Sequence, residues 1–283
     1  MSTYGCTTDR DVVRVAGPEA ESYLQGQLSQ DLDALAVNTS TWTFVLQPQG
    51  KVDTWARITK TASDCFLLDT DPGAGAGLHE RLSRFLLRTK ADVDQLELPA
   101  IAVRGPDAPH GELPDGVLRL PLVGPGVEGY DLLGEGATIP DGVEEGDEAR
   151  LEADRIEHGV PRMGRELTHS TIPAEVGQWI IDESVSFTKG CFVGQELVAR
   201  IDSRGGNVPK TLRALVLDLP VEPGATVTAD GPASAVTSAA VSEHLGPIAL
   251  AFLGRKVEPG VGVVVGETHG VVHELPLVMA GED

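Results

Sequence analysis

The sequence predicts an α+β fold that ends in a small β-barrel. In the first 205 residues, short runs with strand-like alternation lie among segments whose apolar residues have helical spacing. After Gly205-Gly206 the helical spacing stops, and short β-branched runs follow one another, separated by Pro-Gly turns. Because such a series of short strands is typical of a small barrel, we place a domain boundary near residue 206.

The first part of the chain alternates expected strands with expected helices. The strands are at 12–15, 41–46, 55–59 and 65–68, and the helices are at 18–28 and 78–87. The apolar neighbours of Cys65 in the last of these strands indicate a core position. Cys6 lies close to the N-terminus, where we expect a mobile segment.

The middle of the chain is expected to connect two α+β subdomains. Residues 105–146 are rich in glycine, proline and acidic side chains, and we interpret them as loops with one strand at 130–133. A helix is expected over 148–156, because Asp147 can cap its first turn and Gly159 would end it.

The strands expected in the C-terminal part are short. They are at 212–217, after the Pro223-Gly224 turn, at 248–253, after the Pro259-Gly260 turn, and near Val271. His269 and His273 are in the last of them, where four residues of extended chain span about 13 Å. Since one zinc ion cannot bridge that distance, we predict no metal site.

The composition excludes several classes of partner. The chain has 283 residues, with 22 basic and 43 acidic side chains and a net charge of -21. Such a surface repels phosphate backbones and anionic lipid, so we expect no direct nucleic acid partner and no membrane. The first residues do not have the pattern of a secretory signal. Three cysteines, far apart and odd in number, favour a reducing cytoplasm over a disulfide framework.

The most informative segment is Phe-Thr-Lys-Gly-Cys-Phe-Val-Gly-Gln-Glu at 187–196. Gly190 and Gly194 allow a ligand to approach the backbone closely, and a helix is expected directly behind them. Lys189 and the positive end of this helix would favour the thiolate form of Cys191, which attacks electrophiles or binds metal. The alternative is that Cys191 is a small apolar residue packed under a turn.

Two other motifs have plainer interpretations. The glycines at 73, 75 and 77 do not have the spacing of a dinucleotide fingerprint and indicate a turn before a helix. Glu196 and Arg200 are four residues apart on the expected helix, where an ordinary surface ion pair is the alternative to a role in ligand binding.

Several segments together resemble the YgfZ-type folate-binding proteins, which are relatives of the glycine-cleavage T-protein, an aminomethyltransferase. The most specific is Lys-Gly-Cys-Phe-x-Gly-Gln-Glu at 189–196. Further matching segments follow the family's order at 13–31, 46–52, 82–88, 155–161, 172–175 and 199–205. The resemblance implies a GcvT/YgfZ-like fold, with two α+β subdomains in a folate-binding region at 1–205 and a β-barrel at 206–283.

The resemblance also implies a pocket for tetrahydrofolate, or a one-carbon derivative of it, between the subdomains. A carboxylate that follows a Pro-x pair would accept the N–H donors of the pterin ring, which assigns this role to Glu175. The alternative for Glu175 is a solvated loop acid. Arg155 and Arg200 would face the folate carboxylates. The other candidates for the pocket are Gly190, Gly194, Gln195, Glu196 and Arg204, together with Arg162 and Arg165.

The function that the resemblance implies is support for the assembly or repair of iron-sulfur enzymes, including those that modify tRNA. Cys191 would be the working thiol, with Lys189 holding it as thiolate. One thiol cannot hold a stable cluster, so iron-sulfur client or assembly proteins would be transient partners. The Gly-Tyr-Thr-Gly-Glu stretch of true aminomethyltransferases is absent. Two alternatives stay open: a folate-dependent aminomethyl or one-carbon transferase, and a non-catalytic scaffold with a vestigial pocket.

Overall fold

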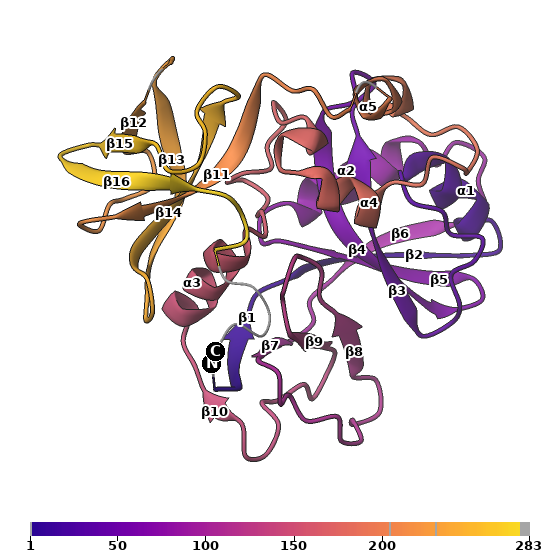
Figure 1. The fold of residues 1–283 in the computed structure, drawn as a ribbon. Helices are drawn as coiled ribbons and strands as arrows, with labels where there is room; N and C mark the ends of the chain where they lie inside the picture. Colours follow the sequence, from indigo (N-terminus) through magenta and orange to yellow (C-terminus); the bar gives the residue numbers. More distant parts are fainter. Residues whose placement is uncertain (1, 204, 230, 278–283) are drawn as a thin grey trace.

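The computed structural model describes residues 2–203, 205–229 and 231–277, and it has the predicted α+β fold (Figure 1). Its strands form two five-stranded sheets and one closed barrel. The barrel lies at one end of the molecule, and the first sheet with its helices lies at the other (Figure 1). No helix within these described ranges is long and apolar enough to cross a membrane.

The first sheet carries two helices, α1 (Ala20–Gln27) and α2 (Gly75–Arg84), on one face. Its strands, in spatial order, are β3 (Thr39–Leu46), β4 (Val52–Ala62), β5 (Cys65–Thr70), β2 (Asp11–Ala16) and β6 (Asp92–Leu96). The helices, together with the residue that follows α1, bury leucines at positions 24, 28, 78 and 82 against alternate residues of the strands. Each buried leucine stabilises the fold by about 1.5–3 kcal/mol.

Helix α2 begins and ends three residues earlier than the predicted 78–87. The carboxylate of Asp11, on β2, accepts hydrogen bonds from the main-chain N–H groups of Gly73 (2.8 Å) and Gly75 (2.7 Å). The helix therefore starts at a carboxylate supplied by a distant strand, which a local pattern cannot reveal. At the other end, the φ of 66° at Arg88 is incompatible with a right-handed helix.

The second sheet contains strands that the sequence does not predict. In spatial order they are β10 (Glu144–Glu145), β1 (Tyr4–Thr8), β7 (Ala100–Arg104), β9 (Gly129–Leu133) and β8 (Leu118–Pro121). The interpretation of 105–146 as loops with one strand is wrong at β8 and β10, which are too short to show alternation. The expected mobile start of the chain is also wrong, because Cys6 is buried in β1 opposite Ala102 of β7. Cys65, expected in the core, is only half-buried.

Helix α3 (Glu148–His158) begins and ends at the predicted signals. The main-chain N–H of Arg150 donates to the carboxylate of Asp147 at 2.8 Å, which caps the first turn. Gly159 ends the helix with a left-handed φ of 68°. The helix packs against β1 on one side and against the barrel on the other, so it joins the second sheet to the barrel (Figure 1).

The C-terminal strands close into the predicted barrel. Around the barrel they are β11 (Lys210–Leu217), β14 (Gly246–Gly254), β13 (Ser234–Ser242), β12 (Thr226–Thr228), β15 (Gly262–Val265) and β16 (Thr268–His273). Alternate side chains point inward and form a core of valine, leucine and alanine. The barrel begins a few residues after position 206, which we keep as the proposed boundary.

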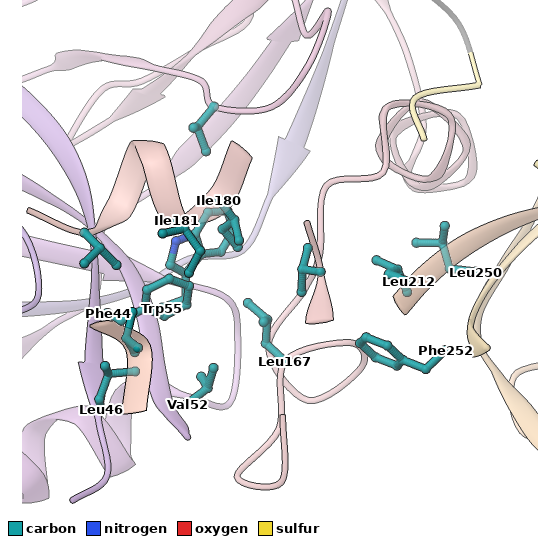
Figure 2. Close-up of a cluster of buried hydrophobic side chains, with 14 of the residues drawn as sticks. Phe44, Leu46, Val52, Trp55, Leu167, Ile180, Ile181, Leu212, Leu250 and Phe252 are labelled. Carbon is teal, nitrogen blue, oxygen red and sulfur yellow. The ribbon is translucent and has the colours of Figure 1, made fainter. Parts of the chain in front are cut away.

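One apolar core connects the barrel to the first sheet. Two short helices, α4 (Gln178–Ser184) and α5 (Gln195–Asp202), contribute to it together with a 3₁₀ turn at Pro173–Glu175. Figure 2 shows Trp55 of the sheet beside the isoleucines of α4, with Leu167 between them and Phe252 of the barrel. This shared core fixes the barrel relative to the sheets.

Candidate functional site

A cavity of about 320 Å³ lies where the two sheets meet helix α3. Among the described residues, its walls come from the β1–β2 turn, the paired strands β3 and β4, the second sheet, and α3 with the segment that follows it. Aromatic, acidic and basic side chains are mixed in these walls. A cavity of this volume and mixed lining is typical of a site for a small organic molecule.

Two stacked tryptophans line the cavity. The rings of Trp42 and Trp55 have centroids 4.2 Å apart and planes inclined by 30°. The indole N–H of Trp55 donates to the Ser184 hydroxyl at 2.9 Å, which fixes the orientation of that ring. Trp179 lies 6.4 Å from Trp55, edge to face, so all three tryptophans of the chain belong to one cluster. Such a wall suits a flat heterocycle.

A buried ion network connects the two sheets behind the cavity. Arg57 on β4 is fully buried and donates to both carboxylate oxygens of Asp69, each at 2.9 Å. It also donates to Asp131 on β9 at 2.9 Å. Burial opposes the charge on Asp131, but the guanidinium groups of Arg104, Arg57 and Arg10 outweigh it and lower the pKa of that carboxyl to about 2. The network therefore holds Asp131 ionised in the cavity wall.

The other arginines of the wall are also paired with acids. Arg10 donates to Asp71 at 2.8 Å, and Arg104 donates to Asp131 at 2.9 Å. Arg162, at the rim, is about one third exposed and lies 3.8 Å from Glu152. These guanidinium groups shape the cavity, and their charge is largely neutralised by neighbouring carboxylates.

Arg155 lines the cavity. Its guanidinium donates to Glu152 at 2.6 Å and to Glu166 at 3.1 Å. It also donates to the carbonyl of Val160 at 2.6 Å and to the Ser238 hydroxyl of the barrel at 2.7 Å. The predicted contact with folate carboxylates stays a prediction, and the structure assigns Arg155 a connecting role between α3, the cavity wall and the barrel.

Glu175 lies in the 3₁₀ turn and not among the described lining residues of the cavity. It is buried, and its carboxylate accepts a hydrogen bond from the main-chain N–H of Ile172 at 3.2 Å. The ammonium of Lys210, at the start of the barrel, is 3.8 Å away. Burial raises the pKa of Glu175. The Pro-x-Glu pattern thus describes a residue that caps its own turn, and its pterin role stays untested.

The predicted thiol is exposed on the loop between α4 and α5, outside the described lining of the cavity. The ammonium of Lys189 donates to three main-chain carbonyl oxygens, those of Gln25 (2.8 Å), Leu28 (2.8 Å) and Gln30 (2.7 Å). Burial lowers the pKa of Lys189 to about 8. Lys189 therefore fastens the loop of Cys191 to the end of α1, a role that differs from the predicted support of a thiolate.

The remaining predicted residues surround the start of α5. Gly194 precedes the helix with a left-handed φ of 82°, and a Cβ there would be 2.5 Å from the carbonyl oxygen of Gln47. The other candidates in this region lie outside the described cavity lining and are Gly190, Gln195, Glu196 and Arg200. Arg165 is exposed and also outside it, whereas Arg204 lies outside the described residues.

Sequence reasoning misses Asp154 and His158, which lie one turn apart on α3 and face the cavity. Nδ1 of His158 lies 2.8 Å from the main-chain oxygen of Asp154 and 3.6 Å from its carboxylate. Burial raises the pKa of Asp154, partly offset by His158 and Arg104. Their spacing of four residues on a predicted helix is the signal that places both side chains on one face.

Comparisons with known proteins identify relatives of this chain. No family model matches the chain. It is 30% identical over 208 residues to an uncharacterized protein of Haemophilus influenzae, which covers 73% of this chain and 71% of that protein. It is 29% identical over 218 residues to the tRNA-modifying protein YgfZ of Edwardsiella ictaluri, covering 69% of this chain and 65% of that protein.

Similarity extends to a mitochondrial protein and to a solved structure. The chain is 29% identical over 259 residues to the iron-sulfur cluster assembly factor IBA57 of Mus musculus, covering 80% of this chain and 71% of that protein. The glycine cleavage system aminomethyltransferase T of Bartonella henselae superimposes with a TM-score of 0.78 at 19% identity. That match covers 98% of this chain and 86% of the other, so the whole fold is shared.

Proposed function

The chain belongs to the family that unites the YgfZ-type proteins with the glycine-cleavage T-protein, and we propose that it binds tetrahydrofolate, or a one-carbon derivative, in the cavity at α3. The observation that carries this proposal is the cavity of about 320 Å³ with a wall of two tryptophans. A reduced pterin is a flat heterocycle with apolar faces and a polar edge. The stacked indoles would contact its face, and the mixed polar wall would contact its edge.

The proposed role of this binding protein is to support the assembly or repair of iron-sulfur clusters in client enzymes. The mouse relative is named as an iron-sulfur cluster assembly factor and the Edwardsiella relative as a tRNA-modifying protein. Cys191 is the proposed working thiol, because it is exposed on a loop that Lys189 fastens to the body of the protein. A single thiol needs a partner's ligands to contact a cluster, so the partner would bind transiently.

Ligand binding can be measured through the tryptophan cluster. All three tryptophans lie at or beside the cavity, so 5-formyltetrahydrofolate should quench the intrinsic fluorescence with a saturable curve. Calorimetry under the same conditions should give one site per chain. Absence of heat and of quenching at millimolar ligand would contradict folate binding. Turnover of methylene-tetrahydrofolate by the isolated protein would favour the transferase alternative.

A further inference from the structure

Most basic side chains of the cavity wall are already paired with carboxylates of the protein. Among the described wall residues, the guanidinium groups of Arg10, Arg104 and Arg155 all donate to carboxylates. Those acids have their partners within the protein. A ligand recognised mainly by its negative charge would have to break these pairs, at the cost of leaving buried charges without a partner. The wall therefore does not favour a ligand that is recognised mainly by its negative charge.

Asp154 is a buried acid of this wall whose carboxylate has no hydrogen-bond donor among the described residues. Its side chain is about nine-tenths buried, and no donor of the described residues is within hydrogen-bond distance of its carboxylate oxygens. The nearest charged groups are Nδ1 of His158 at 3.6 Å and Nε of Arg104 at 4.0 Å. Because the carboxylate lines the cavity, a bound ligand can supply the donor that the described residues do not.

His158 adds a second acceptor on the same helical face. Its Nδ1 lies 2.8 Å from the main-chain oxygen of Asp154, a contact that only a protonated Nδ1 can make favourably. In the neutral ring this leaves Nε2 as an acceptor. His158 and Asp154 both line the cavity, four residues apart on α3. Two acceptors at this spacing can receive two donors from one edge of a ligand.

We infer that Asp154 and His158 accept hydrogen bonds from the N–H edge of the ligand ring. The Asp154 carboxylate accepts from the amino group of a 2-aminopyrimidinone, such as that of a reduced pterin. This inference rests on the proposed function and deepens it, since it moves recognition of the ring edge from Glu175 to α3. The carboxylate discriminates against heterocycles that lack the amino group, because it would then stay buried without a donor.

The test compares the affinities of two proteins for two ligands. Binding of 5-formyltetrahydrofolate, and of its analogue with hydrogen in place of the 2-amino group, is measured by tryptophan quenching for wild type and Asp154→Asn. The lost charged hydrogen bond should weaken binding of 5-formyltetrahydrofolate to the variant roughly ten- to a hundredfold. The analogue should bind the wild type more weakly than 5-formyltetrahydrofolate does, by a similar factor. For the analogue, Asp154→Asn should weaken binding little further.

Two further variants make the test decisive. Glu135→Gln, on an exposed turn outside the cavity lining, removes one negative charge and should leave the affinity unchanged. If Asp154→Asn does not fold, His158→Gln should weaken binding of the same ligand severalfold. Wild-type binding that Asp154→Asn and His158→Gln leave unchanged would overturn this inference alone. No binding of 5-formyltetrahydrofolate by the wild type would overturn the proposed function as well.

Discussion

Near Cys191, the sequence predicts which residues have distinctive positions, but it does not predict the direction of their side chains. The pattern at 189–196 singles out Lys189 and Cys191, and both have distinctive positions. The direction of Lys189 depends on carbonyl groups at the end of α1, more than 150 positions away in the chain. No local pattern carries that information. The same limit explains Glu175, whose sequence context suits a ligand and whose environment is its own turn.

Lys189 is expected to contribute to stability through these carbonyl groups. Replacing it with methionine keeps the apolar stem and removes the donor to Gln25, Leu28 and Gln30. Leaving buried acceptors unpaired should lower the free energy of unfolding by about 1–3 kcal/mol, measured by urea denaturation. The matched change Lys256→Met, at an exposed lysine, should have little effect. Equal stability of the two variants would show that the carbonyl contacts contribute nothing.

The segments that position the site differ in how far the sequence predicts them. Helix α3 is predicted because its limits are local, with Asp147 at one end and Gly159 at the other. The second sheet is not, because its central pairing joins β1 to β7, far apart in the chain. The cavity needs both, so its position could not be predicted although several of its walls could.

The ion network between the sheets should make stability depend on pH in a defined window. The pKa of Asp131 is about 2 in the folded protein and about 3.8 in an unfolded chain. Since the folded value is the lower one, the stabilisation is complete above about pH 4 and is lost as the pH falls through 2. The linked free energy is about 2 kcal/mol. The difference in unfolding free energy between wild type and Asp131→Asn should shrink by that amount from pH 5 to 2, and a constant difference would refute the linkage.

The loop of Cys191, between α4 and α5, contacts the β3–β4 turn, and from this contact we predict an effect on stability. Gly194→Ala places a Cβ 2.5 Å from the carbonyl oxygen of Gln47, at a φ of 82°. The strain should cost about 1–3 kcal/mol of unfolding free energy. Gly190→Ala is the matched control, because no atom lies within 4 Å of its Cβ position. Similar melting temperatures for both variants would mean that the loop adapts and that its position is not fixed.

At the scale of the whole molecule, the cavity and the thiol occupy different places. Helix α3 lines the cavity, whereas Lys189 fastens the thiol loop to α1. Figure 1 shows α1 with the first sheet at one end of the molecule and α3 beside β1 and the barrel. The order of matching segments in the sequence predicts the family's fold but does not reveal this separation. A folate in the cavity and a partner at Cys191 could therefore be bound together.

This separation predicts that ligand in the cavity does not protect the thiol. In Cys65→Ser protein, where Cys6 is buried, the alkylation rate of Cys191 should change less than twofold when 5-formyltetrahydrofolate saturates the cavity. The reason is that Cys191 is exposed and lies outside the described lining. Conversely, Cys191→Ser should keep the wild-type affinity for the ligand and lose support of iron-sulfur enzymes in cells. Protection of the thiol by more than about fivefold would instead place Cys191 at the cavity, and its chemistry would then act on the bound folate rather than on a partner protein.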